Sequence, residues 1–130
     1  MRKRYKFVLR KNIEERAKGM VVAVDFDGTI TKDYDFPHNI GVLRDGCKDA
    51  IDYIREKHKV VIWTCRSGEY LAEAVKFLND NGIEYDGINA DIYHKTDRKI
   101  LADIYIDDKN IFCKSVDWAK IKQHFENLNG

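Results

Sequence analysis

The chain has 130 residues and a mass of 15.2 kDa, a length that suits one domain rather than two. Hydrophobic residues make up 44% of it, with one Pro and eight Gly, which excludes a collagen-like or linker-rich chain. The longest apolar run, Met20 to Val24, is far shorter than the ~20 residues that span a bilayer, and no apolar stretch follows the basic first residues as in a secretory signal. We therefore expect a soluble cytoplasmic domain with no membrane partner.

Charge is unevenly placed along the chain, although the formal total is only +1. Residues 1–19 carry eight Lys or Arg against Glu14 and Glu15, a local charge of +6, whereas the remainder carries 15 basic and 20 acidic residues, a charge of −5. Residues 1–19 are therefore treated as a basic N-terminal extension and residues 20–130 as the main domain. The extension is either a solvated segment or an arm that touches nucleic acid or another polyanion. The three cysteines include no C-x-x-C pair and indicate neither a disulfide framework nor a zinc site.

Short apolar runs alternate with helical spacing along the chain. Residues 5–9 are a candidate strand, followed by a short helix within the extension. Residues 20–24 form a continuous apolar run, typical of a strand buried on both faces, and residues 28–45 predict a loop or flap. The later predicted elements are, in order, a helix over 47–58, a strand over 60–63, a helix from about 71 that stops at Asn81-Gly82, short strands at 83–85 and 104–106, and a helix over 118–128.

This alternation of strands and helices is the signature of an α/β fold. We expect a single three-layer, Rossmann-like domain around a mostly parallel central sheet. In such sheets ligands bind beyond the carboxyl ends of the strands, so the residues that follow each strand are the ones to inspect.

Polar side chains follow three of the predicted strands. Asp25 and Asp27 come after the first strand, Thr64 after the second, and Asp107 with Asp108 after the strand at 104–106. Four carboxylates crowded at one edge repel one another strongly. A hard divalent cation with oxygen ligands resolves that repulsion, and Mg²⁺ typically takes one or two carboxylates together with phosphate oxygens. The pattern therefore predicts a Mg²⁺ site that leaves room for phosphate.

The sequence Asp25-Phe26-Asp27-Gly28-Thr29 after a buried strand resembles the first motif of the haloacid dehalogenase superfamily. Thr64 resembles its second motif and Asp107-Asp108 its fourth. The third motif is a Lys shortly before the last strand, for which Lys95 and Lys99 compete; Lys99 is preferred because it runs directly into that strand. The resemblance spans about residues 20–128 and is most similar to a small bacterial and phage branch with short members.

The resemblance implies a phosphomonoester hydrolase. Asp25 would attack phosphorus and form an aspartyl-phosphate, and Asp27 would serve as the general acid and then the general base. Mg²⁺ would be held by the Asp25 carboxylate, by the backbone carbonyl of Asp27, by Asp107, and by Asp108 directly or through water.

The phosphate group of the substrate would be bound by residues after the second strand and before the last one. Thr64 would hydrogen-bond a phosphoryl oxygen and Lys99 would neutralise its charge. Arg66 either grips substrate bidentately or pairs with a surface Asp, and we favour phosphate binding. Cys65 is expected to be a buried small apolar residue rather than a nucleophile, since Arg66 follows it too closely for a Cys-dependent phosphatase.

The gaps between motifs leave no room for a cap domain. Only 36 residues separate Asp27 from Thr64 and 34 separate Thr64 from Lys99, and predicted elements fill both gaps. Capless relatives often act on macromolecular phosphates or use a neighbouring subunit as a lid, which makes a homo-oligomer one alternative. Nucleic-acid ends, or a small sugar phosphate or nucleotide, are the substrate classes under consideration.

Other functional classes are also considered. One is phosphotransfer to an acceptor other than water, which sequence does not separate from hydrolysis. Another is a non-catalytic module that retains the metal site and binds nucleic acid or protein. A phosphate-sensing receiver domain is disfavoured, because its acidic pair belongs on the first strand and its phosphoacceptor on the middle one.

Overall fold

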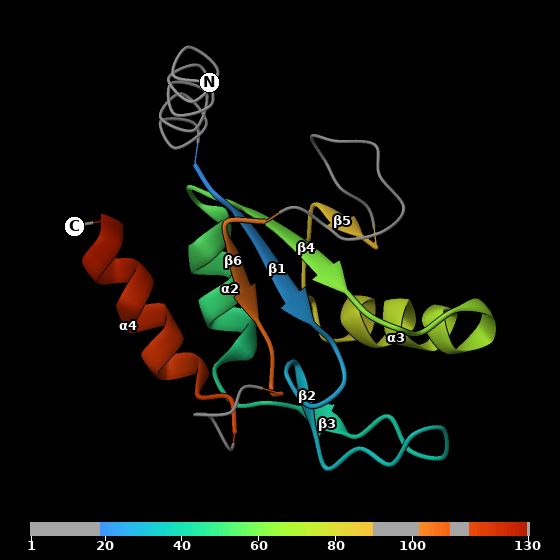
Figure 1. Ribbon diagram of the computed structural model, residues 1–130. Helices are drawn as coiled ribbons and strands as arrows, with labels where there is room; N and C mark the ends of the chain where they lie inside the picture. Colours follow the sequence, from blue (N-terminus) through green and yellow to red (C-terminus); the bar gives the residue numbers. More distant parts are fainter. Residues whose placement is uncertain (1–18, 90–101, 110–114, 130) are drawn as a thin grey trace, which may run out of the picture.

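In the described part of the chain, parallel strands form a four-stranded central sheet in the order β5-β4-β1-β6 (Figure 1). The computed structural model describes residues 19–89, 102–109 and 115–129. Within these, β1 is Val21–Asp25, β4 is Lys59–Trp63, β5 is Gly87–Ile88 and β6 is Ile104–Ile106. All neighbouring pairs are parallel, with β1 between β4 and β6. The carboxyl ends of β1, β4 and β6 therefore meet at one edge.

Strand β1 is apolar throughout because both of its faces are covered. Val22 and Val24 belong to the larger core cluster, whereas Val21 and Ala23 belong to a second cluster with Val61. All four side chains are at most 5% exposed. Adjacent strand residues point to opposite faces, so an unbroken apolar run is what a central strand requires.

Among the described residues, three helices contribute to the larger core. They are α2 (Cys47–Arg55), α3 (Gly68–Asp80) and α4 (Trp118–Asn129), and α2 packs beside α4 (Figure 1). The connections β1-α2-β4 and β4-α3-β5 step the same way across the sheet, so right-handed crossovers place α2 and α3 on the same face. The buried helical residues of this cluster are Cys47, Ala50, Ile51, Ile54, Ala74, Leu78, Trp118 and Phe125.

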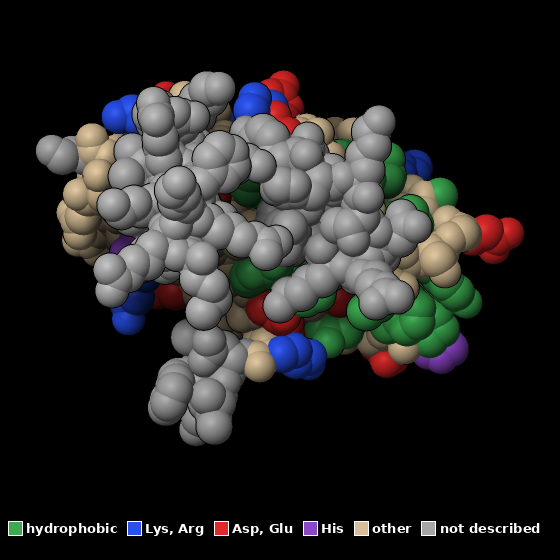
Figure 2. Space-filling model, turned by 45° about the horizontal axis from the view of Figure 1, so that its top comes forward, with side chains coloured by type: hydrophobic (Ala, Val, Ile, Leu, Met, Phe, Trp, Pro, Cys, Tyr) green, Lys and Arg blue, Asp and Glu red, His purple; other side chains and the backbone are tan. Residues whose placement is uncertain are grey.

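The segment predicted as a flap contains a small hairpin. Strands β2 (Thr31–Lys32) and β3 (Val42–Leu43) pair antiparallel and lie beyond the carboxyl ends of β1 and β4 (Figure 1). Hydrophobic side chains gather towards the lower right of Figure 2, on the side of the flap. The exposed ones include Phe36 and Val42 of the flap and Tyr70 at the start of α3.

One predicted strand is wrong. Residues 83–85 are not a strand, and β5 begins instead at Gly87. The Ile83 amide donates to the carbonyl of Leu78 at the end of α3, and its side chain is 3% exposed in the core. The connection then reaches Asp86, whose carboxylate accepts the Val60 amide and whose own amide donates to the Val60 carbonyl, both at 2.8 Å. The β5 pairing with β4 begins at the next residue, Gly87.

The expected α/β domain with a mostly parallel central sheet is confirmed. Between Asp27 and Thr64 the chain forms the flap, α2 and β4, with no cap domain. The strand and helix predicted within residues 1–18 lie outside the described residues. In the described part of the chain, no helix has both the length and the apolar character needed to cross a membrane.

Candidate functional site

Three carboxylates meet where β1 and β6 end. Asp25 is the last residue of β1, and Asp107 and Asp108 directly follow β6, its neighbour in the sheet. One carboxylate oxygen from each lies within 4.8 Å of the others. The parallel pairing of the strands thus brings together the acidic residues that the sequence predicts to converge.

A tight turn after β1 sets the distance between these carboxylates. The carbonyl of Phe26 accepts the amides of Thr29 and Ile30 at 3.2 and 3.0 Å. Gly28 lies within this turn at a φ of +84°, a conformation that other residues resist. A Cβ at Gly28 would also collide with the carboxylate of Asp108. Glycine therefore lets Asp108 approach the turn.

Thr29 connects the two acidic segments. Its hydroxyl donates to Oδ2 of Asp25 at 3.2 Å and accepts the backbone amide of Asp108 at 3.0 Å. Its carbonyl accepts the indole N–H of Trp118 at 2.8 Å, which ties the turn to α4. Through these contacts Thr29 fixes the turn against both Asp108 and α4.

The electrostatics of the cluster are unfavourable to charge on Asp25. Burial, followed by the negative charge of Asp107, raises the pKa of Asp25 to about 7, and Asp108 adds to the rise. Hydrogen bonds from the backbone at Phe26 and from Thr29 oppose it. Crowded carboxylates with oxygen-only ligands form the kind of donor set that suits a hard cation.

Asp27 faces a different partner. Its carboxylate accepts a bidentate pair of hydrogen bonds from Arg66, 2.8 Å from Nε and 2.7 Å from Nη2. The carboxylate of Asp27 is therefore not part of the three-oxygen cluster, although Asp27 lines the same pocket. The expectation that the backbone carbonyl of Asp27 holds a metal stays a prediction.

Arg66 is arranged differently from the favoured prediction. Its side chain is only 3% exposed, and besides Asp27 it donates to the carbonyl of Tyr70 at 3.1 Å. Its guanidinium lies 5.3 Å from the ring centroid of Phe26 and 5.0 Å from that of Phe36. The two donors that would grip a phosphate bind Asp27 instead, so Arg66 orients an acidic residue of the site.

Thr64 sits at the end of β4 in a fixed orientation. Its amide donates to Oδ1 of Asn89 at 2.8 Å, and its hydroxyl oxygen accepts the Arg66 amide at 3.2 Å. The hydroxyl proton can therefore be directed to a ligand oxygen. Asn89 was missed in the sequence, because nothing in the chain marks a residue 25 positions away as the partner of Thr64.

A pocket of about 260 Å³ opens over these groups. The site residues that line it are Asp25, Asp27, Thr64 and Asp107. The rest of the lining consists of Tyr34, Trp63, Cys65 and Lys109. Cys65 is exposed, so the expectation that it is buried is wrong; it follows the strand at the pocket rim rather than lying within the sheet. No motif in the sequence marks Trp63 or Lys109 as site residues, and the only signal for Tyr34 is its position in the flap. Lys95 and Lys99, the candidates for the third motif, lie outside the described residues.

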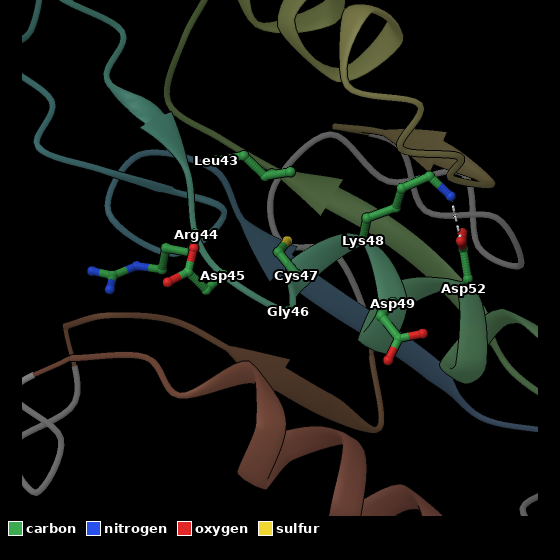
Figure 3. Close-up of a pocket in the computed structure, with 8 residues that line it drawn as sticks. All are labelled: Leu43, Arg44, Asp45, Gly46, Cys47, Lys48, Asp49 and Asp52. Carbon is green, nitrogen blue, oxygen red and sulfur yellow. Dashed lines mark hydrogen bonds and ion pairs between the residues drawn. The ribbon is translucent and has the colours of Figure 1, made fainter.

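A larger hollow, of about 440 Å³, lies at the start of α2 (Figure 3). Its acidic side chains are Asp45, Asp49 and Asp52, and Lys48 is paired with Asp52 at 2.6 Å. In Figure 3 the side chain of Asp49 points away from that pair. These groups do not converge on a common point, so the smaller pocket at the strand ends is the better candidate site.

Comparison with known proteins gives one informative match. No family model matches the chain, and no curated protein matches it. The fold is similar to a solved structure of a conserved protein coded by a locus of Bacteroides thetaiotaomicron, with a TM-score of 0.73 and 31% sequence identity. The match covers 85% of this chain and 92% of that one. By this identity and coverage, the chain belongs to the same family as the conserved Bacteroides thetaiotaomicron protein.

Proposed function

We propose that the protein is a Mg²⁺-dependent phosphomonoester hydrolase that works through an aspartyl-phosphate on Asp25. The observation that carries this proposal is the cluster of Asp25, Asp107 and Asp108, with oxygens within 4.8 Å of one another. Two of its members, Asp25 and Asp107, line a pocket together with Asp27 and Thr64. The resemblance of the three described motifs to the haloacid dehalogenase superfamily supports the same reaction class.

The residues present fit a magnesium ion. Asp25, Asp107 and Asp108 would hold it, together with the backbone carbonyl of Asp27. A cation there would relieve the repulsion that raises the pKa of Asp25 to about 7. When bound, Mg²⁺ supplies positive charge that screens the phosphoryl oxygens from the attacking carboxylate.

Asp25 is the nucleophile in this proposal. Its carboxylate oxygen bonds to phosphorus while the bond from phosphorus to the ester oxygen breaks, and Asp27 gives that departing oxygen its proton. Water then attacks the phosphorus of the intermediate while Asp27 takes a proton from that water. The bond between phosphorus and the Asp25 oxygen breaks, which releases inorganic phosphate and restores the Asp25 carboxylate. The hydroxyl of Thr64 donates a hydrogen bond to a phosphoryl oxygen during both steps.

Arg66 orients Asp27 between the two steps. The bidentate pair of hydrogen bonds from Arg66 fixes the side chain of Asp27 at the pocket that Asp25 also lines. Arg66 is therefore a positioning residue rather than a substrate ligand.

The test is phosphate release from a generic aryl phosphate, with and without Mg²⁺, by wild-type protein and by Asp25→Asn. We expect magnesium-dependent turnover that is lost in Asp25→Asn. Turnover that survives in Asp25→Asn would rule out Asp25 as the nucleophile. Lys95→Ala and Lys99→Ala variants then identify the third-motif residue, since the one that contacts phosphate should lose activity by orders of magnitude and the other little.

A further inference from the structure

Resting on the phosphatase proposed above, we infer that its substrate is a nucleoside phosphate, whose base stacks on Tyr34 and Trp63 while its phosphate meets Asp25. The polar groups that act on phosphate come from the strand ends: Asp25, Asp27, Thr64 and Asp107. Tyr34 and Trp63 are the aromatic residues of the lining. Neither has a part in the phosphate chemistry, so their presence calls for a ligand with an apolar or planar group next to the phosphate.

Trp63 is fixed directly beside the nucleophile. It is the register partner of Asp25 in the pairing of β4 with β1, so both side chains lie on the same face of the sheet. Its ring meets that of Tyr105 edge to face, with centroids 5.7 Å apart, across β1 at the position of Ala23. A small residue at Ala23 allows this contact, and the contact holds the indole in place. Trp63 thus forms a rigid aromatic wall next to Asp25.

Tyr34 brings a second aromatic ring from the flap. An added Cβ at Gly28 would lie 3.2 Å from Cε1 of Tyr34, so the ring packs against the turn that carries the acidic residues. The flap is anchored near this ring by Arg44, whose Nε donates to the carbonyl of Gly28 at 2.9 Å. Phe36 anchors it further on by packing against Tyr70 and Arg66. Tyr34 is therefore held in the pocket.

The size and charge of the pocket favour a nucleotide. At about 260 Å³ it is smaller than the ~300–1,000 Å³ of typical pockets that enclose a whole ligand. It suits a phosphate and an adjoining ring, with the rest of the substrate outside.

Lys109, with its side chain 73% exposed, lines the pocket and places its ammonium 3.6 Å from Asp108. A cation at that position can meet a further phosphate, as a nucleic-acid strand would provide.

Base stacking on aromatic side chains contributes about 1–3 kcal/mol per base, so the base should improve kcat/KM by roughly 5- to 150-fold. The first experiment compares hydrolysis of a nucleoside 5′-monophosphate with that of ribose 5-phosphate, which lacks only the base. We expect wild-type protein to favour the nucleotide by that factor. Tyr34→Leu and Trp63→Leu should bring the ratio of the two kcat/KM values towards one, and Trp63→Phe should retain most of the preference. Tyr53→Leu, which changes an aromatic residue in α2, is the matched control.

The second experiment measures binding without turnover. In Asp25→Asn with Mg²⁺, the nucleotide should quench the fluorescence of Trp63, whereas ribose 5-phosphate should not. In Asp25→Asn/Trp63→Phe the remaining tryptophan emission comes from Trp118, which is 1% exposed. That emission should not change when the nucleotide is added. Oligonucleotides with a 5′- or 3′-terminal phosphate, tested beside the mononucleotide, distinguish a strand end from a free nucleotide as the source of the base.

The two proposals fail in different ways. If wild-type protein hydrolyses no phosphomonoester but the nucleotide still quenches Trp63, the phosphatase is wrong and the base site stands. If ribose 5-phosphate is hydrolysed as well as the nucleotide, and neither Tyr34→Leu nor Trp63→Leu changes the ratio, the base site is wrong and the phosphatase stands. Absence of both turnover and quenching overturns both.

Discussion

At the scale of single residues, Asp25 and Asp27 show how two carboxylates of one pocket acquire different surroundings. Asp25 is half-buried beside two other acidic residues, and its hydrogen bond from Thr29 only partly offsets them. The carboxylate of Asp27 instead accepts two hydrogen bonds from the guanidinium of Arg66. In the proposed mechanism Asp25 binds the cation and attacks phosphorus, whereas the carboxylate of Asp27 is held by the guanidinium of Arg66.

The raised pKa of Asp25 predicts how stability depends on pH. Its pKa moves from 3.8 to about 7 on folding, so the folded protein favours the protonated form. The stability this group contributes is fully present below pH 3.8 and is lost as pH rises through about 7. In EDTA, the melting temperature of wild type should therefore fall more between pH 5 and 8 than that of Asp25→Asn. Mg²⁺ should raise the melting temperature more at pH 8 than at pH 5; an equal rise at both would contradict the assignment.

Arg66 should be intolerant of substitution by lysine. A lysine cannot form the two parallel hydrogen bonds to Asp27, nor fill the space between Phe26 and Phe36. We expect Arg66→Lys to lower the free energy of unfolding by about 1.5–3 kcal/mol, the range for hydrogen bonds to charged groups. The rate of phosphate release should fall, but by less than in Asp27→Asn. Urea unfolding and phosphate release measure the two effects, with Lys76→Met, in an exposed pair with Asp80, as the control that changes neither.

At the scale of elements, the turn after β1 determines whether the site can assemble. Gly28→Ala combines left-handed strain of about 1–2 kcal/mol with a collision against Asp108. Gly68→Ala carries comparable strain at a φ of +55°, but an added Cβ there meets nothing within 4 Å. We expect both variants to be less stable, and only Gly28→Ala to lose the rise in melting temperature caused by Mg²⁺. Loss of that rise in both variants would mean that the collision is not the cause.

The elements also show what could be predicted from the sequence. The strands β1, β4 and β6 and the three helices follow from apolar runs and helical spacing, because burial on known faces imposes those patterns. The three residues at 83–85 were misassigned because alternation of Ile83, Glu84 and Tyr85 does not distinguish a strand from a chain that fills the core after a helix. Convergence of Asp25, Asp107 and Asp108 was predictable, since parallel strands end at one edge. The pairing of Arg66 with Asp27 was not, because it joins side chains 39 positions apart.

At the scale of the whole molecule, one core connects the sheet to α2, α3 and α4. Phe125 of α4 is 1% exposed within this core, and its ring lies 5.5 Å from that of His58. Phe125→Ala should lower the free energy of unfolding by about 3–5 kcal/mol, the usual cost of such a cavity. Leu128→Ala, on the same helix at a side chain that is 54% exposed, should cost less than about 0.5 kcal/mol. Denaturant unfolding compares them, and equal losses would show that α4 does not belong to the cooperative unit.

His58 also brings together the two ends of the described domain. Its Nδ1 accepts the amide of Met20 at 2.9 Å, so its Nε2 carries the proton and faces Oδ1 of Asn129 at 3.2 Å. The first strand thus starts, and the last helix stops, at a single imidazole ring. A short covalent linker from residue 129 to residue 20 would therefore close the domain into a circle without stretching it. Cutting that circle at the exposed turn around Gly82 would give a circular permutant in which β1, the strand that carries Asp25, is made in the middle of the chain instead of near its start.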